Sequence, residues 1–292
     1  MDKWISCNAC GADKFESLST VDGWTIGKCG ACGLVYVNPA PFFEPTSDFA
    51  LLSREFEFTQ YQHRPITAAV EGFERQQLAF DLEEITRLKG RRPEWESHVR
   101  HLEIGCGSGA SVHAAAGLGW SSIGIDIDPE LVGEGRERLG ADLRCTPLLD
   151  SGFPDEAFDF IRLRDVIEHL PDPYDSLVKV RDLLAPDGMV LIVTPNEGGL
   201  VTRVRLATGR KKTLVATVAP PHHLHGFDGD SLRRICGRAG LKVYAVGTTT
   251  PVDARYVTSN NMRSSGRKGA NAVWRLGKLL GMGAVLVAWA GR

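Results

Sequence analysis

Four of the seven cysteines form two CxxC pairs near the N-terminus, Cys7 with Cys10 and Cys29 with Cys32. The intervening stretch, residues 11–28, has a length typical of zinc sites, and four thiolates complete the tetrahedral coordination of zinc. A glycine follows each pair, in CNACG and CGACG, where a tight turn lets backbone N–H groups face the thiolates. These residues predict a structural zinc ion. Two redox dithiols are the alternative, and the duplication of the motif argues against them.

A second group of residues has the spacing of a nucleoside-binding turn. Glu103, Gly105, Gly107 and Gly109, in LEIGCGSGA, stand between an apolar run and a helical segment. Glycines at such a turn let the backbone approach a ligand closely, and the next helix offers free N–H groups. The following apolar run ends at Asp126, whose carboxylate can accept hydrogen bonds from both hydroxyls of a ribose. A dinucleotide-dependent dehydrogenase is the alternative, but GCGSGA lacks the third glycine at the dehydrogenase spacing.

Carboxylates and histidines form a third group, at two places that follow apolar runs. DVIEH contains Asp165, Glu168 and His169, and PPHHLHGF contains His222, His223 and His225. In a sheet wrapped by helices, both places fall at the carboxyl edge of the strands, where ligands bind. A histidine that titrates near neutral pH can act as a general base, so His169 or a loop histidine is a candidate base. Alternatively, these side chains only make hydrogen bonds that order a substrate loop.

Short apolar runs alternate with helical segments from Val99 onward, which is the pattern of a parallel sheet wrapped by helices. The predicted strands are residues 101–104, 122–126, 142–145, 158–163, 189–194, 241–248 and 283–290. The last of these suits a closing antiparallel strand. Amphipathic spacing predicts a helix over 66–89 and a further helix over 270–280. Asp128 and Asp228 have the residue type and position of helix N-caps.

The composition is that of an ordinary globular protein, with 292 residues, 43% of them hydrophobic, and a formal net charge of −2. This charge favours neither nucleic acid nor an anionic membrane as a partner. An odd number of cysteines and no signal-like or spanning apolar run predict a soluble cytoplasmic protein. We expect three domains: a zinc ribbon over 1–41, a linker and helical cap over 42–98, and an α/β domain over 99–292.

Four segments together resemble a known family. LEIGCGSG and GIDID resemble the first two motifs of class I S-adenosylmethionine methyltransferases. FPDEAFDFIRLRDVIEHLPDP and LLAPDGMVLIVTPN resemble the segments around the fourth and fifth strands of that family. The resemblance covers about residues 99–291. It implies a Rossmann-like sheet of seven strands, mostly parallel with an antiparallel last strand, and S-adenosylmethionine as the methyl donor.

The resemblance also implies that residues following successive strands bind this donor. They are Glu103, Gly105, Gly107 and Gly109 at the methionine and ribose, Asp126 at the ribose, Ile127, Thr146 and Pro147 at the adenine, and Arg164 and Asp165 at the mouth of the fourth strand. Glu103 would either fix the turn or meet the amino group, and plain loop structure is an equal alternative for Thr146 and Pro147. Because the donor is a reactive sulfonium, the protein must mainly align a nucleophile and, for poor nucleophiles, remove a proton.

The DxxEH and HxHxF elements are similar to the ExxEH and HxHxF elements of certain RNA 2′-O-methyltransferases and UbiG-type quinone O-methyltransferases. In those enzymes carboxylates and histidines can bind a divalent metal that anchors the acceptor hydroxyls. Carried over to this chain, the ligands of a Mg²⁺ or Mn²⁺ ion would be Asp165, Glu168, His169 and His225. Asp165 replaces the glutamate of those enzymes, which shortens the reach of the carboxylate by a methylene.

The ribbon allows two kinds of partner. Zinc ribbons often contact nucleic acid, and some ribosomal RNA methyltransferases carry an N-terminal zinc module. The charged residues of this ribbon are Lys3, Lys14 and Lys28 against Asp2, Asp13, Glu16 and Asp22. They form no surface that could follow phosphates, so nucleic acid is not the expected partner. The ribbon resembles more nearly those of bacterial methyltransferases that modify sugars, glycans or other secondary metabolites, where it would cap the acceptor pocket.

Basic residues also cluster, at Arg203, Arg205, Arg210, Lys211 and Lys212 and again over 263–278. They are either a solvated face or, for the first cluster, a site for an anionic part of the acceptor such as a phosphate.

We therefore expect an O-methyltransferase of a small hydroxylated metabolite, such as a sugar, a glycan precursor or a secondary metabolite. Glu168 and His169, or a histidine among residues 222–225, would assist the acceptor. N-methylation and C-methylation stay open as alternatives. So do an RNA methyltransferase that binds RNA through the ribbon, and a donor-binding protein without catalysis. The sequence predicts neither the acceptor itself nor the oligomeric state.

Overall fold

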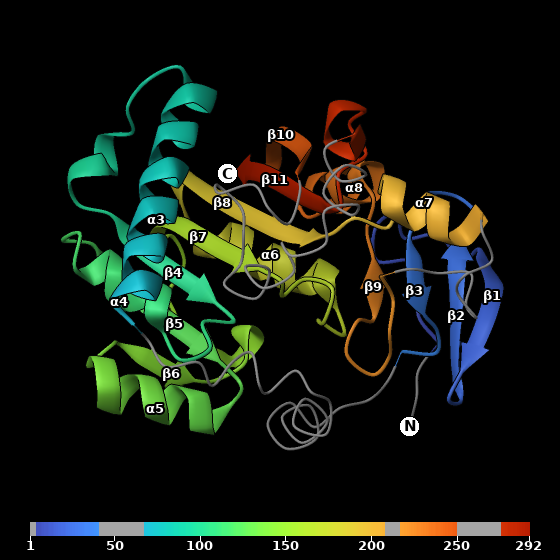
Figure 1. Ribbon diagram of the computed structural model, residues 1–292, viewed down its shortest axis with the longest axis horizontal. Coiled ribbons are helices and arrows are strands. Elements are labelled where there is room, and N and C mark those ends of the chain that lie inside the picture. The colour runs from blue at the N-terminus through green and yellow to red at the C-terminus, as the bar shows by residue number, and fades with distance from the viewer. Residues whose placement is uncertain (1–3, 41–66, 208–216, 250–275) are drawn as a thin grey trace. The chain divides into compact units, whose positions relative to one another are not determined.

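The computed structural model describes residues 4–40, 67–207, 217–249 and 276–292 (Figure 1). The strands are β1 (Phe15–Val21), β2 (Trp24–Cys29), β3 (Val35–Val37), β4 (Arg100–Ile104), β5 (Ser121–Asp126), β6 (Leu143–Cys145), β7 (Phe158–Arg164), β8 (Leu184–Pro195), β9 (His225–Gly226), β10 (Lys242–Thr249) and β11 (Val285–Gly291). The helices are α3 (Ala68–Lys89), α4 (Ala110–Ala116), α5 (Pro129–Leu139), α6 (Pro173–Leu183), α7 (Leu200–Ala207) and α8 (Gly229–Arg238), with short 3-10 helices η1 (Glu94–Ser97) and η2 (Leu148–Asp150).

Seven strands form one sheet in the order β10-β11-β8-β7-β4-β5-β6. Strand β4 pairs in parallel with β5 and β7, and β5 pairs in parallel with β6. The last strand, β11, is inserted between β10 and β8 and runs antiparallel (Figure 1). All seven predicted strands are present within a few residues of their expected ends. The predicted α/β fold with a mostly parallel sheet is therefore confirmed.

The helix starts and ends follow the local signals in the sequence. Helix α3 ends at Lys89, as expected, and the next residue, Gly90, has the left-handed φ of 68° that commonly ends a helix. The side chain of Asp128 accepts two backbone N–H groups at the start of α5, and Asp228 forms a capping box at the start of α8. The helix expected over 270–280 and most of the two basic clusters lie outside the described residues.

Contacts within the chain divide it into two compact units, which are described separately. The first unit comprises Met1–Phe42, Asp165–Val178 and Ile192–Trp289, and the second comprises Phe43–Arg164, Lys179–Leu191 and Ala290–Arg292.

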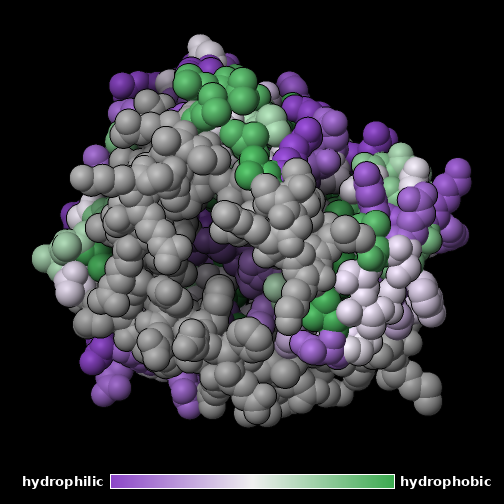
Figure 2. Space-filling view, turned by 45° about the vertical axis from the view of Figure 1, so that its right-hand side comes forward, coloured by the Kyte–Doolittle hydropathy of each residue, from purple (hydrophilic) through white to green (hydrophobic). Residues whose placement is uncertain are grey.

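In the view of Figure 2, the coloured hydrophobic residues form separate patches among hydrophilic ones. None of the described helices is both long enough and apolar enough to span a membrane.

The first unit contains a four-stranded sheet in the order β1-β2-β3-β9. Strands β1 and β2 form a hairpin whose turn is Asp22-Gly23, with positive φ at both residues. This Asp-Gly pair is the sequence signal for a tight hairpin, because both positions need a left-handed backbone. Strand β9 comes from a distant part of the chain and pairs with β3. It belongs to the segment that contains His222, His223 and His225, which we call the histidine segment.

In the second unit, helix α3 buries a face that is largely polar. The buried residues of this helix are Glu74, Gln77, Leu78, Asp81 and Ile85. Phe73 and Phe80, two large apolar residues of this helix, are only half-buried. The reason is electrostatic, because the helix carboxylates pair with two arginines of β7.

Arg162 is the centre of this arrangement, a cation in the middle of an apolar strand whose side chain is 1% exposed. Its Nε lies 3.3 Å from Asp81 Oδ2, and its Nη1 lies 3.2 Å from Glu103 Oε2. Nη1 also donates to Ser111 Oγ at 2.7 Å, and Ser111 Oγ donates to Glu103 at 2.9 Å. A second pair joins Arg164 Nη1 to Glu74 Oε2 at 3.2 Å. Loss of Arg162 would leave two buried carboxylates uncompensated, which is strongly destabilising.

The two carboxylates that share Arg162 have opposite pKa shifts. Burial would raise the pKa of Glu103, but the charge of Arg162 and the hydrogen bond from His101 bring it down to about 2. For Asp81, burial outweighs Arg162 and Arg164 and raises the pKa to about 6. An aspartate in the unfolded chain titrates near about 3.9, so the folded state holds a proton on Asp81 more tightly. Asp81 therefore stabilises the fold most at low pH, and this contribution is lost as the pH rises from about 4 through 6.

We predict that Asp81→Asn removes this pH dependence, because asparagine cannot titrate. The unfolding free energy of the variant, relative to the unmodified protein, should increase by about 1 to 3 kcal/mol between pH 4 and pH 7. Urea unfolding followed by circular dichroism at several pH values measures it. Glu84→Gln is the matched control, since Glu84 lies on the same helix and pairs with the exposed Arg87. Parallel pH profiles for Asp81→Asn and the unmodified protein would show that Asp81 does not titrate as described.

Candidate active site

The Gly-rich turn joins β4 to α4 through three left-handed glycines. Gly105, Gly107 and Gly109 have φ values of 69°, 53° and 78°. A Cβ added at Gly109 would lie 2.8 Å from the side chain of Leu143, whereas one added at Gly107 would meet no atom of the described residues within 4 Å. Gly109 is thus needed for packing against β6, while the described part of the chain leaves space for a ligand beside Gly107.

Asp126 ends β5 beside this turn. One carboxylate oxygen accepts the N–H of Gly107 at 2.8 Å, and the other accepts the N–H of Asp128 at 2.9 Å. Burial raises the pKa of this carboxyl, although hydrogen bonds from the backbone N–H groups of Asp128, Gly107 and Ile127 oppose the shift. A carboxylate has about four lone-pair positions, so Asp126 keeps capacity for a further donor such as a hydroxyl.

The other predicted donor-side residues fall into two sets. Thr146 belongs to the first, because its N–H donates to the Asp126 carbonyl at 3.0 Å and so brings the segment after β6 next to Asp126. Ile127 and Pro147 are half-buried neighbours of these residues in the chain. Glu103 and Arg164 form the second set, since their side chains are paired inside the protein with Arg162 and Glu74 as described above. Glu103 also accepts a hydrogen bond from Ser111 of α4, so it links the two elements that flank the turn.

Glu168, His169 and His223 form a compact group in the first unit. One ligand atom from each lies within 4.8 Å of the others, and the two imidazole rings meet edge to face with centroids 4.7 Å apart. Glu168 Oε2 accepts a hydrogen bond from Thr194 Oγ1 at 2.9 Å. Its buried Oε1 has no hydrogen-bond partner among the described residues and lies 3.9 Å from His169 Nε2. This arrangement places one carboxylate oxygen and two imidazoles close enough together to bind one ligand.

Backbone carbonyls determine which ring nitrogens are available. His169 Nδ1 lies 2.9 Å from the carbonyl of His222, and His223 Nδ1 lies 2.8 Å from the carbonyl of Thr217. A carbonyl only accepts, so each Nδ1 carries the proton and each Nε2 keeps a lone pair. Histidines that bind metals in proteins are usually oriented in this way.

Burial sets the charge of the group. It lowers the pKa of His169 to about 3 and also lowers that of His223, so both rings are neutral at neutral pH. Burial, together with the charge of Asp165, raises the pKa of Glu168 to about 8. Neutral imidazoles are ready to bind a cation, and a bound cation would favour the ionised form of Glu168. The donor set therefore fits a divalent metal ion.

Three predicted acceptor-side residues lie outside this group. His225 Nε2 lies 3.4 Å from Asn8 Nδ2, and the His225 ring stacks on another aromatic residue of the ribbon. His222 contributes its carbonyl to His169, and Asp165 donates its backbone N–H to Val193 at 2.9 Å. The structure thus brings His223, and not His225, together with Glu168 and His169.

Sequence reasoning missed several residues that support these sites. Thr194 and Thr217 orient the group but are common residue types in a strand and a loop, and no spacing marked them. Arg162 did have a signal, because it is the charged residue within the apolar run FDFIRL of a predicted strand. A cation there must be paired when the strand is buried.

The four cysteines of the CxxC pairs converge in the ribbon. Their Sγ atoms lie within 4.8 Å of one another, with Cys7 3.5 Å from Cys32 and Cys10 3.6 Å from Cys29. Tetrahedral zinc with Zn–S bonds of about 2.3 Å would hold its sulfurs about 3.8 Å apart. The thiols are free, with no disulfide between them. The donor set therefore fits zinc.

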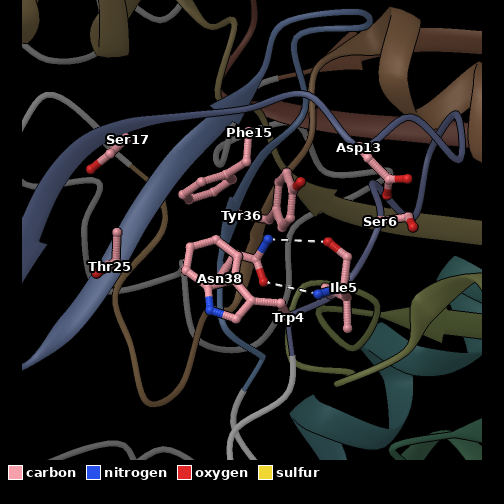
Figure 3. Close-up of a pocket in the computed structure, with 9 residues that line it drawn as sticks. All are labelled: Trp4, Ile5, Ser6, Asp13, Phe15, Ser17, Thr25, Tyr36 and Asn38. Atoms are coloured by element: carbon pink, nitrogen blue, oxygen red, sulfur yellow. Dashed lines mark hydrogen bonds between the residues drawn. The ribbon is translucent and has the colours of Figure 1, made fainter.

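A cavity of about 600 Å³ opens in the same ribbon (Figure 3). Trp4, Phe15 and Tyr36 form its aromatic wall, and adjacent rings meet edge to face. Asp13 is the one charged residue among its described lining residues, which suits an uncharged ligand better than an anion. None of the predicted catalytic residues lines it, although Tyr36 also stacks on His225.

Comparison with known proteins identifies a methyltransferase family, which agrees with the geometry described above. A family model described as a methyltransferase domain matches residues 71–246. A ubiquinone biosynthesis O-methyltransferase of Parvibaculum lavamentivorans is 35% identical over 192 residues, which are 63% of this chain and 66% of the relative. A probable S-adenosylmethionine-dependent methyltransferase of Mycolicibacterium smegmatis is 30% identical over 143 residues, 49% of this chain and 51% of the relative. The chain thus spans less than two thirds of the length of these relatives.

A solved structure supports the fold. Geranyl diphosphate C-methyltransferase from Streptomyces coelicolor matches with a TM-score of 0.52 and 15% identity, over 86% of this chain and all of the other chain (100%). At that identity the likeness concerns the fold alone. The match to the methyltransferase family covers more than half of the chain. The strand order and the Gly-rich turn of this chain agree with that family. This chain therefore belongs to the class I S-adenosylmethionine-dependent methyltransferases.

Proposed function

We propose that this enzyme transfers the methyl group of S-adenosylmethionine to a hydroxyl oxygen of a small metabolite. The group of Glu168, His169 and His223 carries the proposal, because a hydroxyl is a weak nucleophile that must lose or share its proton. The relatives named as ubiquinone biosynthesis O-methyltransferases support it. Since these relatives match over only part of their length, we propose an acceptor class and no single compound: a hydroxylated ring such as a sugar, a glycan precursor or a secondary metabolite.

On the donor side, we assign the ribose to Asp126 and the methionine part to the turn at Gly105 and Gly107. The support is the remaining hydrogen-bond capacity of Asp126 and the space beside Gly107, into which no described residue projects. Ile127, Thr146 and Pro147 would form the adenine site, because Thr146 is hydrogen-bonded to the end of β5. Glu103 and Arg164 would act indirectly, through their pairs with Arg162 and Glu74.

On the acceptor side, we assign a divalent cation to Glu168, His169 and His223. An imidazole with a pKa near 3 is a poor base at neutral pH but a good metal ligand, so burial favours metal binding over a lone histidine base. The two imidazoles favour Mn²⁺ over Mg²⁺, which prefers oxygen ligands. When bound, such an ion would lower the pKa of an acceptor hydroxyl. Thr194, Thr217 and the His222 carbonyl hold the three ligands in place.

The reaction needs only one bond made and one broken. The acceptor oxygen attacks the methyl carbon as the bond from that carbon to the sulfonium sulfur breaks, which leaves the neutral thioether product. The hydroxyl proton leaves to solvent or to a neighbouring base. The structural zinc of the ribbon takes no part, because four cysteines fill its coordination.

We predict that Asp126→Asn weakens the binding of the demethylated donor, S-adenosylhomocysteine, by about tenfold or more, because charged hydrogen bonds to the ribose are lost. Isothermal titration calorimetry measures the affinity. Asp155→Asn is the control, because Asp155 is an exposed carboxylate in the same unit. An affinity for Asp126→Asn within twofold of the unmodified protein would exclude the ribose assignment.

We predict that Glu168→Gln and His223→Ala each lower methyl transfer to a hydroxylated acceptor by about 100-fold, with donor affinity nearly unchanged. A panel of catechols, phenols and sugars with isotope-labelled donor, followed by mass spectrometry, identifies both the acceptor and the methylated atom. His98→Ala is the control, since His98 is exposed and remote in sequence from the group. Products methylated only on nitrogen or carbon would refute O-methylation.

We also predict that removal of loosely bound metal with a chelator abolishes turnover while zinc stays in the ribbon. Added Mn²⁺ should restore turnover better than Mg²⁺, and it should fail to do so in Glu168→Gln. Metal analysis of each sample verifies the zinc content. Full activity in chelator-treated protein that retains only its zinc would contradict a second metal ion.

A further inference from the structure

The histidine segment completes the ribbon sheet. Strand β9 pairs antiparallel with β3, with Tyr36 opposite His225 and Val35 opposite Gly226. A further backbone bond joins Val37 N–H to the Leu224 carbonyl at 3.0 Å. Figure 1 shows β9 alongside β3, although about 190 residues separate them in the chain. Without β9, strand β3 would be an unpaired edge of the ribbon.

The same segment is hydrogen-bonded to the group of Glu168, His169 and His223, which we call the acceptor-side group. The carbonyl of Glu168 accepts the N–H of Leu224 at 2.8 Å and the N–H of His225 at 3.1 Å. The His222 carbonyl, three residues earlier than His225, is the partner of His169 Nδ1. The segment that carries His223 is therefore held by the ribbon and by Glu168 at once.

Two side chains of the ribbon, Tyr36 and Asn8, contact the His225 ring. The Tyr36 ring lies parallel to the His225 ring, with an interplanar angle of 4° and centroids 6.4 Å apart. Asn8, between Cys7 and Cys10 in the first zinc knuckle, places its Nδ2 3.4 Å from His225 Nε2. Asn8 is itself fixed, because its carbonyl accepts a hydrogen bond from Arg238 Nη1 at 2.7 Å.

His225 therefore has a positioning environment and not that of a ligand. Its side chain is buried, it contacts Asn8 and Tyr36, and it lies outside the group of Glu168, His169 and His223. A residue with this environment fixes the backbone on which neighbouring functional residues stand.

We propose that the cysteine ribbon is the positioning element of the acceptor-side group, with Asn8 and Tyr36 as positioning residues that act through His225 and β9. This inference rests on the proposed function of Glu168, His169 and His223. Ordered packing in the zinc knuckle fixes Asn8, which fixes His225. Strand β9 then fixes the Glu168 carbonyl and the position of His223. Displacement of reacting groups by about 1 Å can cost about 100-fold in rate, so loss of the ribbon would impair the acceptor step.

Hydrogen exchange with mass spectrometry on the full chain tests this proposal without reference to methyl transfer. The variants are Asn8→Ala and Tyr36→Leu, with Tyr36→Phe as the conservative replacement that keeps the ring. Ser17→Ala is the control, because Ser17 is exposed on β1, away from β9 in the sheet order. Zinc content, measured on each protein, reports whether the ribbon remains folded.

In zinc-retaining Asn8→Ala and Tyr36→Leu, we expect exchange to quicken by about tenfold in peptides that cover residues 165–170 and 217–227. Peptides that cover α4 and α5 should be unchanged, and so should all peptides of Tyr36→Phe and Ser17→Ala. The double variant Cys29→Ser with Cys32→Ser, which lacks zinc, should show the same local loss of protection with donor affinity within about threefold of normal.

The proposal is overturned if residues 165–170 keep their normal protection in the zinc-free double variant or in the zinc-retaining single variants. It is also overturned if Ser17→Ala loses protection to the same extent. Turnover gives the second readout, in which Asn8→Ala and Tyr36→Leu should lose about 10- to 100-fold and Tyr36→Phe should be near normal. Normal protection with lost turnover would count against the positioning role. Lost protection in an enzyme that methylates nitrogen or carbon would keep the positioning role and refute O-methylation.

Discussion

The carbonyl oxygen of Glu168 accepts two backbone N–H groups, from Leu224 and His225, and the first unit depends on this interaction. It fixes the peptide after Glu168, so the carboxylate and the imidazole of His169 have defined directions. It also anchors the segment that carries His223, which would otherwise be a loop between α7 and α8. Because β9 is simultaneously a strand of the ribbon sheet, one backbone oxygen links the cysteine knuckles to the acceptor-side group.

A comparable constraint acts in the second unit, where Arg162 is shared by Asp81 of α3 and Glu103 of β4, just before the Gly-rich turn. Burying a guanidinium requires opposite charges close by, and those charges come from two elements that must therefore dock together. The polar face of α3 follows from this requirement. Both units thus use a buried polar contact to fix a segment that carries proposed site residues, one by backbone hydrogen bonds and the other by charge.

The sequence was sufficient to predict features that depend on local spacing. The seven strands, the end of α3 before Gly90 and the Asp128 and Asp228 caps are all encoded within a few neighbouring residues. The left-handed glycines of the turn belong to the same class. Features that depend on distant partners were not predictable in this way. The buried face of α3 depends on arginines in β7, which apolar periodicity does not register.

The choice between His223 and His225 illustrates the same limit. Both belong to HxHxF, and residues two apart would lie on the same side of a regular strand. In the structure only His225 belongs to β9, which pairs with β3, whereas His223 lies before this strand in an isolated bridge with Ala219. The resemblance to other methyltransferases favoured His225, whereas the ribbon of this chain takes His225 for its own packing and leaves His223 beside Glu168.

The most direct test of this account is electron spin echo spectroscopy of Mn²⁺ added to the zinc-loaded protein. Two directly bound histidine nitrogens should appear in the spectrum, because His169 and His223 each keep Nδ1 on a backbone carbonyl and would bind the ion through Nε2. One of these nitrogens should vanish in His223→Ala and both should persist in His225→Gln. A spectrum without histidine nitrogen, or one in which His225→Gln removes a bound nitrogen while His223→Ala leaves both, would contradict the account.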